Sequence, residues 1–487
     1  MMKKFLLIFL SAVLLSLSFH PLHLYFLAWF GLIPLLFAVS ETKPTHTFLI
    51  GTSFGFLLAF FSLFWIAFLQ IEIRVKVLMF FGLVVMFLYL GLYYGTGLLI
   101  ARITGFWFLP FIIAGLEYLK GLGELGFPWL SLGYSQADYP VIIQQASIYG
   151  VYGISFWLVL INVALFYFIK KKSMKNLILT ILFFFLPIIY GLIRLHLIPE
   201  YKKEIAIGIV QPNIDPNLKF TPRMRDETFN RLIRLSIGCV EKTSDKLSLI
   251  VWPETATPIN IKAKNIYQST VVELVNRLDV PIFTGTPIYE SEKNEIYNGA
   301  VLIRPGYGIT QEYKKIHLVP FGEHIPFDKY IPILRKIDFG EGDYSAGNEY
   351  TVFTTDGIEF SCLICFESIF PEISREFVRR GAKLLVNITN DGWFGKLSGP
   401  QQHNDMAILR TVECGVPLVR SANTGISMVV DQYGRVLRKT GLFEEDIITY
   451  SIPYYSIRTF YLIIGNLFWM LSLLFIPIIL LYKCIKF

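Results

Sequence analysis

Long apolar stretches constrain this chain more than any other feature of its sequence. Seven stretches precede residue 200 and one follows residue 455, and each approaches the roughly 20 residues that a helix needs to cross a bilayer. They cover residues 4–20, 23–40, 48–70, 77–97, 102–120, 148–169, 176–195 and 457–482. With 54% hydrophobic and 17% charged residues, the chain of 487 residues is too apolar for a soluble globule. The sequence therefore predicts an integral membrane protein with about eight transmembrane helices.

The distribution of Lys and Arg predicts the orientation of these spans. If the spans alternate in direction, most of the basic residues that flank them fall on one side, which should be cytoplasmic. These residues are Lys3, Lys4, Lys43, Arg102, Lys170, Lys171, Lys172, Lys175, Lys483 and Lys486, whereas Arg74 and Lys76 are exceptions. The block 200–455 then lies outside the cytoplasm. The first stretch resembles a signal peptide in its charged start, but the next span follows so closely that we expect it to be retained.

One ionisable residue falls inside a predicted span. Glu117 lies near the end of the stretch 102–120, and a carboxylate is costly to place in lipid. One alternative is that its side chain faces a polar cavity. Because it is close to the segment end, we expect it to reach the membrane interface instead. The following loop, 121–147, is rich in Gly, Pro and aromatic residues and is predicted to be irregular.

Residues 200–455 have the pattern of an α/β domain. Short apolar runs alternate with helix-like segments, which is typical of layered α/β folds. Strands are expected at 205–210, 247–252, 281–285, 299–304, 310–317, 358–364, 383–387, 417–420, 427–431 and 434–437, and helices at 222–242, 264–278, 371–381 and 403–414. We therefore predict a membrane domain over 1–199, an extramembrane domain over 200–455, and a last span with a short tail over 456–487.

Three reactive side chains follow strand ends or turns in the extramembrane domain. Glu254 follows Trp252-Pro253, Lys315 lies in a Lys-Lys pair, and Cys365 ends an apolar run. Open α/β sheets place their sites at the carboxyl ends of strands. Taken singly, such residues are more often a turn carboxylate, a solvated lysine and a packing thiol.

In this order the three residues resemble the Glu–Lys–Cys triad of the nitrilase superfamily, whose fold is an α-β-β-α sandwich. Further motifs narrow the resemblance to the apolipoprotein N-acyltransferase family, with its seven spans, nitrilase-like periplasmic domain and last span. These motifs are Gly126-Phe-Pro-Trp-Leu130, Gly133-Tyr-Ser-Gln136, Trp252-Pro-Glu254, Leu318-Val-Pro-Phe-Gly-Glu323 and Asn390-Asp-Gly-Trp-Phe-Gly395. The family lies in the bacterial inner membrane, which the resemblance implies here too.

The resemblance implies a reaction with two halves. The Cys365 thiol, deprotonated by Glu254, attacks the ester of a phospholipid, and Lys315 stabilises the oxyanion together with the backbone N–H near Phe366. The resulting thioester then acylates the N-terminal amine of a diacylglyceryl-cysteine apolipoprotein. No metal and no diffusible cofactor is implied.

The resemblance also implies supporting roles around the triad. Glu323 and Glu367 match acidic positions that the family uses near its triad. Phe366 stands where the family often carries Tyr, and Phe220 where it can carry Trp. Phe220, Trp393 and Phe394 are candidates for contact with acyl chains.

Several alternatives stay open at this stage. Cys362 and Cys365 form a Cys-x-x-Cys pair, but residues three apart on a strand point to opposite faces, which disfavours a redox motif. His317, His324 and His403 lack metal-ligand spacing. A membrane-tethered amidase acting on a small amide is one alternative function, and a transporter or scaffold is another. The modest net charge of +7, without an aromatic-basic stripe, argues against nucleic-acid binding.

Overall fold

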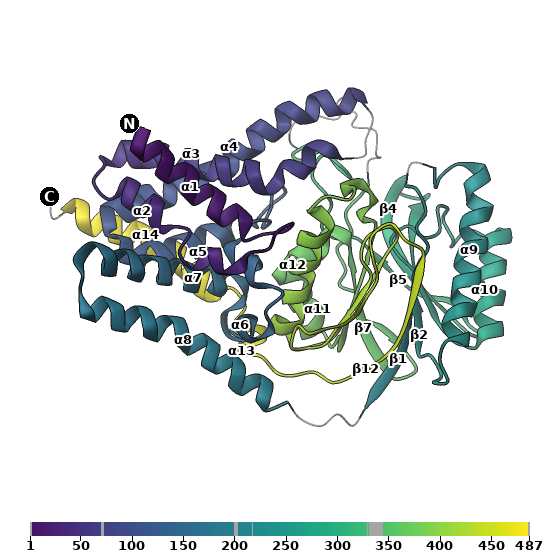
Figure 1. The fold of residues 1–487 in the computed structure, drawn as a ribbon. Helices are drawn as coiled ribbons and strands as arrows, with labels where there is room; N and C mark the ends of the chain where they lie inside the picture. Colours follow the sequence, from purple (N-terminus) through teal and green to yellow (C-terminus); the bar gives the residue numbers. More distant parts are fainter. Residues whose placement is uncertain are drawn as a thin grey trace. The chain divides into compact units, whose positions relative to one another are not determined.

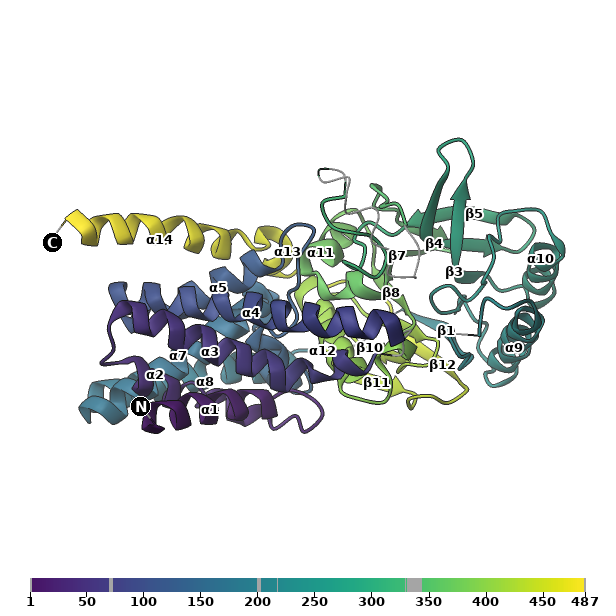
Figure 2. The ribbon, with the colours of Figure 1, turned by 90° about the horizontal axis from the view of Figure 1, so that it is seen from above.

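The computed structural model describes residues 2–69, 73–198, 203–216, 218–328, 330 and 344–485. The chain divides into two compact units, each of which can be followed in Figures 1 and 2. The helical unit comprises Met1–Ile198, Leu397–Asp405 and Thr459–Phe487, and the α/β unit comprises Pro199–Lys396 and Met406–Arg458.

The helical unit contains α-helices joined by short 3-10 helices and loops. In chain order these elements are α1 (Met2–Leu17), η1 (Tyr25–Trp29), α2 (Ile33–Val39), α3 (Pro44–Leu63), η2 (Phe64–Phe68), α4 (Ile73–Thr104), η3 (Phe106–Phe108), α5 (Leu109–Lys120), η4 (Leu132–Gln136), α6 (Pro140–Ile143), α7 (Ala146–Lys171), α8 (Met174–His196), α13 (Phe460–Ile464) and α14 (Leu467–Ile485). Helix α12 (Gly399–Cys414) begins in this unit and ends in the α/β unit.

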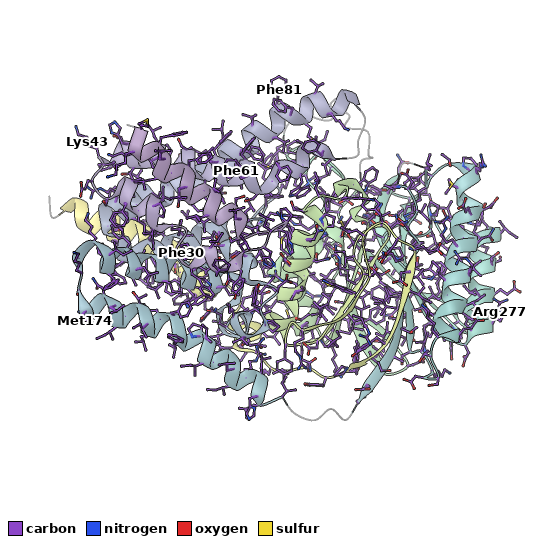
Figure 3. The ribbon with its side chains drawn as sticks, viewed as in Figure 1. Phe30, Lys43, Phe61, Phe81, Met174 and Arg277 are labelled. Atoms are coloured by element: carbon purple, nitrogen blue, oxygen red, sulfur yellow. The ribbon has the colours of Figure 1, made fainter. Side chains whose placement is uncertain are left out.

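Among the described residues, four helical segments are long and apolar enough to cross a membrane: Pro44–Phe68, Met79–Thr104, Ala146–Lys171 and Met174–His196. The apolar window of α7 is 67% buried and that of α8 only 11%, so α7 is central in the unit and α8 faces outward. Large apolar side chains such as Phe81 and Met174 project outward from their helices (Figure 3) and are 65% and 67% exposed. Such extensive apolar exposure suits a protein whose helices contact lipid.

The predicted count of eight spans is not confirmed, because the remaining apolar stretches form shorter described helices. The stretch 102–120 contains a break at Gly105, whose φ of 116° ends α4, and α5 then has only 12 residues. A helix of that length rises about 18 Å, against a hydrocarbon thickness of about 30 Å. The stretch 23–40 is likewise divided between η1 and α2.

The expectation that Glu117 reaches the interface is wrong. Its side chain is buried inside the helical unit, and its Oε1 accepts a hydrogen bond from the backbone N–H of Leu132 at 2.9 Å. Nearby, the Nζ of Lys120 donates to the backbone carbonyl of Trp129 at 2.8 Å. These two side chains of α5 therefore bind the backbone of the irregular loop that follows the helix. The Glu117 carboxylate thus has a hydrogen-bond partner inside the protein, which lipid would not offer.

The α/β unit is built on two six-stranded sheets. The first has the order β12-β1-β2-β3-β4-β5 and the second the order β11-β10-β9-β8-β7-β6. The strands are β1 (Glu204–Gln211), β2 (Leu249–Val251), β3 (Ile282–Glu290), β4 (Glu295–Arg304), β5 (Gly308–Lys314), β6 (Phe353–Thr355), β7 (Ile358–Ile364), β8 (Leu384–Thr389), β9 (Leu418–Ala422), β10 (Met428–Val430), β11 (Val436–Lys439) and β12 (Asp446–Pro453). Strands β1, β2 and β3 run parallel in the first sheet, as do β7, β8 and β9 in the second.

Helices cover the outer faces of these sheets. Helices α9 (Pro222–Glu241) and α10 (Ile266–Leu278) pack on the first sheet (Figure 1) around buried side chains such as Phe229, Leu232 and Val271. Helix α11 (Pro371–Arg379) packs against the second sheet at β7. The two sheets face each other, with the ring of Phe283 from the first in edge contact with Phe353 and Phe360 of the second. The α-β-β-α arrangement of layers predicted for this region is therefore present.

Most expected elements of this unit have a counterpart in the structure, and the exceptions are instructive. The sequence pattern predicts neither β6 nor β12. Strand β12 pairs antiparallel with β1 along eight residue pairs, although only three of its own residues are buried. Polar residues interrupt its apolar ones, so it contains no continuous apolar run, and an edge strand does not need one.

A buried ion pair holds the second sheet together at its carboxyl end. Arg420 of β9 donates through Nη2 to Oδ2 of Asp391 at 2.7 Å and through Nη1 to Oδ1 of Asn387 on β8. Both members of the ion pair are completely buried. Thr389 donates to the other carboxylate oxygen of Asp391 at 2.9 Å, so the buried charge is well compensated.

We predict that Arg420→Ala destabilises the chain by about 3–5 kcal/mol, because it leaves the Asp391 carboxylate buried without its cation. Denaturant unfolding of the full chain in detergent, followed by tryptophan fluorescence, measures the loss. Arg277→Ala is the matched control, since Arg277 lies exposed in α10 (Figure 3). Equal stability of the two variants would contradict the prediction.

Candidate active site

The three residues of the predicted triad lie together at one end of the α/β unit. Glu254 follows β2, Lys315 follows β5, and Cys365 follows β7. The charges of Glu254 and Lys315 both act on the Cys365 thiol. The structure thus brings together three groups that are far apart in the sequence.

Glu254 lies in a turn that crosses close over β3. Gly285 of β3 permits this approach, since a Cβ there would lie 2.5 Å from the backbone nitrogen of Thr255 and 2.8 Å from the Cα of Glu254. Thr255 itself has a φ of 46°, in the left-handed region. The tight turn directs the Glu254 carboxylate into the interior rather than into solvent.

The carboxylate of Glu254 is almost fully buried and has partners at both oxygens. Oε1 accepts a hydrogen bond from the side-chain amide of Asn298 at 2.8 Å, and Oε2 accepts one from the backbone N–H of Asn390 at 2.9 Å. Burial raises the pKa of Glu254, Lys315 opposes that rise, and the negative charge of Glu323 adds to it. A carboxylate whose pKa is raised toward neutrality is better suited to accept a proton.

Lys315 is a fully buried cation between two carboxylates. Its Nζ lies 2.7 Å from Oε2 of Glu323 and 3.9 Å from Oε1 of Glu254. Burial alone would lower the pKa of Lys315, but the charges of Glu323, Glu254 and Cys365 outweigh it and raise that pKa above its usual value. Lys315 therefore stays protonated, and its ammonium compensates the charges of the two carboxylates.

Cys365 is the first residue of the 3-10 helix η6 (Cys365–Ile369) and has a φ of 49°. A non-glycine residue in this region is uncommon, and such strain is often found at functional sites. Its side chain is half-buried, unlike those of Cys239, Cys362 and Cys414, which are buried. Burial and the charge of Glu254 raise the pKa of the thiol, whereas Lys315 and a hydrogen bond with Thr389 oppose the rise. At neutral pH the group is a thiol that needs a base.

Glu367 fixes the backbone that carries two of the three triad residues. Its Oε1 accepts hydrogen bonds from the Tyr313 hydroxyl at 2.6 Å and from the backbone N–H groups of Ile316 at 2.8 Å and His317 at 3.2 Å. Its Oε2 accepts one from the backbone N–H of Ile364 at 2.7 Å. The segment beside Lys315 and the residue before Cys365 are thus tied to one carboxylate, whose pKa burial raises to about 7.

The other predicted supporting residues take different positions. Glu323 binds Lys315 directly and also accepts from Asn298 at 2.7 Å and from the backbone N–H of Val319 at 2.8 Å. The ring of Phe366 is buried and packs against those of Phe370 and His317.

The predicted acyl-contact residues lie on two separate segments. Phe220 is 53% exposed in the turn before α9. Trp393 and Phe394 are half-buried in the one-turn helix η7 (Asp391–Phe394), which directly follows the Asn390 that donates to Glu254. Residues 329 and 331–343, in the loop that follows Glu323, lie outside the described residues.

Sequence reasoning missed two polar residues that complete the site. Asn298 donates to both Glu254 and Glu323, and in the sequence it only precedes the apolar run 299–304, with no motif that indicates its role. Lys219 is buried with its Nζ 3.2 Å from the backbone carbonyl of Glu254. Burial lowers the pKa of Lys219 to about 8, although the Glu254 charge opposes this shift.

The same geometry bears on the alternatives left open for the Cys362–Cys365 pair and for the histidines. Cys362 is buried within β7 and Cys365 lies beyond its end, and the two are not joined in a disulfide. His317 is packed on Phe370, with 3.9 Å between ring centroids. Burial and the neighbouring Lys315 lower the pKa of His317 to about 4, which keeps its ring neutral.

Comparison with known proteins gives matches over nearly the whole chain. The apolipoprotein N-acyltransferase N-terminal domain family matches residues 11–165, and the carbon-nitrogen hydrolase family matches residues 206–461. An apolipoprotein N-acyltransferase of Geobacter metallireducens is 36% identical over 96% of this chain and 92% of its own length. One from Chlorobaculum tepidum is 33% identical over 94% of this chain and 92% of its own length.

Among solved structures, Saccharomyces cerevisiae Nit3 of the nitrilase superfamily matches 52% of this chain and 91% of its own, with 19% identity and a TM-score of 0.42. The two sequence families together account for both units, and the identity to the curated relatives extends across them. The chain belongs to the apolipoprotein N-acyltransferase family and carries that family's carbon-nitrogen hydrolase domain.

Proposed function

We propose that this chain transfers an acyl chain from a phospholipid to the N-terminal amine of a diacylglyceryl-cysteine apolipoprotein through a thioester on Cys365. The observation that carries the proposal is the half-buried Cys365 thiol, on which the charges of Glu254 and Lys315 act, in a chain of this family. Lipoprotein acylation fits the name of the relatives. The phospholipid donor fits the apolar exposed helices, which suit a setting where both substrates are anchored in a bilayer.

In the first half-reaction Glu254 takes the proton of Cys365 as the sulfur attacks the carbonyl carbon of the phospholipid ester. The carbonyl π electrons move to oxygen, and Lys315 stabilises the oxyanion together with the backbone N–H near Phe366. When the oxyanion collapses, the C–O bond breaks, and the proton held by Glu254 passes to the leaving alkoxide. A lysophospholipid departs and the acyl group remains on sulfur.

In the second half-reaction the amine of the apolipoprotein attacks the thioester carbonyl. Glu254 accepts a proton from the amine, and the C–S bond breaks to form an amide. The proton then returns to Cys365, which restores the resting site. A thioester is a suitable intermediate because it reacts readily with an amine, and the site needs no further reagent.

We also propose a membrane arrangement for the reaction. The chain crosses the bacterial inner membrane about eight times, with shorter helices supplementing the four long ones, and the residues 200–455 lie on the periplasmic side. Phe220, Trp393 and Phe394 contact acyl chains of the substrates. This arrangement is supported by the distribution of Lys and Arg and by the apolar exposure of the helical unit.

We expect the purified chain to acquire a label from a phospholipid carrying a radioactive acyl chain, because the first half-reaction leaves that chain on Cys365. Hydroxylamine should release the label, and Cys365→Ala should abolish it.

Cys239→Ala is the matched control, since Cys239 is buried in α9 away from the site, and it should be labelled as the parent is. A parent that transfers acyl groups without ever acquiring label, or a labelled Cys365→Ala, would contradict the proposal. Labelling followed only by release of free fatty acid, with no acylated apolipoprotein, would favour hydrolysis instead.

The pH dependence tests the role of Glu254 as base. We expect the single-turnover rate of thioester formation to fall on the acidic side, in a range above the ordinary carboxyl pKa of about 4.3, because burial raises the pKa of Glu254. Glu323→Gln removes a negative charge that contributes to this rise, so the acidic limb should move to lower pH. The maximal rate should also fall, because Lys315 loses a partner.

Glu292→Gln serves as the control, since Glu292 is exposed in the turn between β3 and β4. Its pH profile should match that of the parent chain. An acidic limb that Glu323→Gln leaves unmoved, or shifts to higher pH, would show that Glu254 is not the group that titrates.

A further inference from the structure

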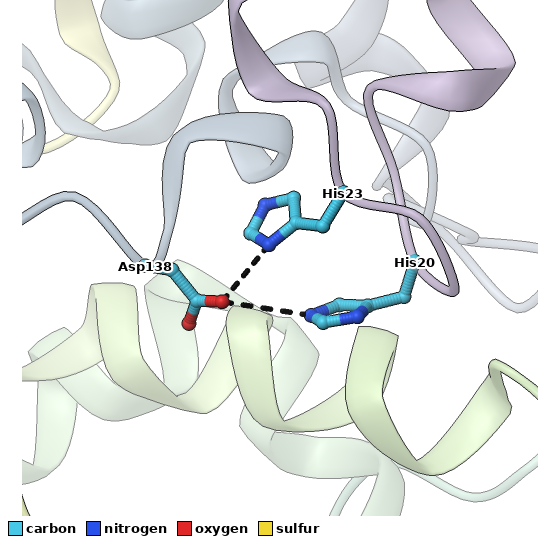
Figure 4. Close-up of side chains that lie close together, drawn as sticks. All are labelled: His20, His23 and Asp138. Carbon is cyan, nitrogen blue, oxygen red and sulfur yellow. Dashed lines mark hydrogen bonds and ion pairs between the residues drawn. The ribbon is translucent and has the colours of Figure 1, made fainter.

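A second cluster of titratable side chains lies in the helical unit, and the proposed reaction does not use it. His20 and His23 lie in the turn between α1 and η1, Asp138 lies between η4 and α6, and Asp405 lies in α12. Figure 4 shows the carboxylate of Asp138 directed at both imidazole rings. All four residues belong to the helical unit.

The spacing of the donor atoms matches that of a metal site. Nδ1 of His23 is 2.9 Å from Oδ2 of Asp138, and Nε2 of His20 is 3.8 Å from the same oxygen. Oδ1 of Asp405 lies 3.5 Å from Nε2 of His20. Ligands bound tetrahedrally to zinc at about 2.0–2.1 Å lie about 3.3 Å from each other. The three separations bracket this value. The donor atoms of His20, His23 and Asp138 all lie within 4.8 Å of one another, and Asp405 joins the cluster through its contact with His20.

The far side of the His23 ring is arranged as it is in known metal sites. Its Nε2 is 3.0 Å from the backbone carbonyl of Ser135, which can only accept, so Nε2 carries a hydrogen. Metal-binding histidines commonly donate their second ring N–H in this way, which fixes the tautomer and the ring orientation. The lone pair of Nδ1 then points toward Asp138, as a ligand atom should.

This orientation requires a positive species between the side chains. With Nε2 protonated, a neutral His23 would direct the lone pair of Nδ1 at a carboxylate oxygen only 2.9 Å away, which is repulsive. A proton on Nδ1 satisfies this one contact. A metal ion satisfies His23, His20 and Asp138 at the same time, because all three donor atoms lie within 4.8 Å of one another.

We propose that His20, His23 and Asp138, with Asp405 as a fourth ligand, form a binding site for a divalent metal ion of the zinc type. Two imidazole nitrogens and two carboxylate oxygens are a donor set that zinc accepts. The side chains of His23 and Asp405 are nearly buried, whereas that of Asp138 is 46% exposed and gives the ion a path from solvent. The bound ion would join three segments remote in the sequence, which is a structural role separate from the acyl transfer.

The proposal differs from the sequence-based expectation that the chain needs no metal. The carboxylate partner of the His20-Pro-Leu-His23 pair is 115 residues away from His23 in the sequence, so the sequence pattern alone does not indicate the site. It is also independent of the proposed reaction, whose residues all lie in the α/β unit.

Metal content tests the site directly. The full chain in detergent is stripped with a chelator, dialysed against Zn²⁺ and analysed for bound zinc by mass spectrometry. We expect about one ion per chain, and its loss in His23→Gln and in the near-isosteric Asp138→Asn. His46→Gln, which changes an exposed histidine in the first turn of α3, should bind zinc like the parent.

Two further measurements keep the proposal falsifiable if a variant folds poorly. Zn²⁺ should raise the unfolding temperature of the parent and of His46→Gln, because the ion binds the folded state. Co²⁺ in the parent should give the visible absorption of a tetrahedral nitrogen and oxygen site. If the stripped parent takes up no zinc, the imidazole rings and the Asp138 carboxylate share only a proton. If zinc uptake is unchanged in both His23→Gln and Asp138→Asn, the ion binds elsewhere. Either result overturns the proposal.

Discussion

The buried ammonium of Lys315 is the group on which the arrangement of the candidate active site depends. A lone cation in a protein interior is costly, and here the cost is offset by Glu323 at 2.7 Å and Glu254 at 3.9 Å. The carboxylates need partners in turn, and Asn298 supplies one amide that bonds to both. Because each member of this network is an ion-pair or hydrogen-bond partner of another, none can be removed without leaving a buried polar group without that partner.

The backbone explains how residues from distant strands meet in this network. Glu254 and Cys365 follow β2 and β7, which belong to different sheets and are both paired in parallel with their neighbours. Since the sheets lie face to face, their carboxyl ends can supply groups to one site. Glu367 then joins the segment beside Lys315 to the end of β7, and Asn390 after β8 reaches across to Glu254. The site is therefore a junction between the sheets, fixed by backbone N–H groups.

How much of the fold and of the candidate site can be predicted depends on whether each element or residue has a recognisable pattern in the sequence. Strands such as β1 and β8 were predicted because each is a short apolar run with clear ends, whereas the partly exposed β12 has no such pattern. The triad was predicted through family motifs, but Asn298 and Lys219 were not, because their roles arise only from tertiary contacts. In the helical unit, apolar composition correctly predicts long apolar helices, and four segments among the described residues are long enough to cross a membrane. It could not reveal the break at Gly105 or the inward orientation of Glu117, since both depend on local geometry rather than on hydropathy.

The balance of charge accounts for a thiol that is protonated at rest. Glu254 and Glu323 carry negative charges, and Lys315 and the nearby Lys219 can carry positive ones, so the resting cluster is close to neutral when the Cys365 thiol keeps its proton. A resting thiolate would add an uncompensated negative charge to a buried site. In the proposed reaction, the proton passes to Glu254 only as negative charge develops on the substrate oxygen beside Lys315. The total charge of the site then stays constant through the attack, and the rearrangement of buried charge is confined to a few ångströms. This is the condition under which preorganised groups stabilise a transition state most effectively.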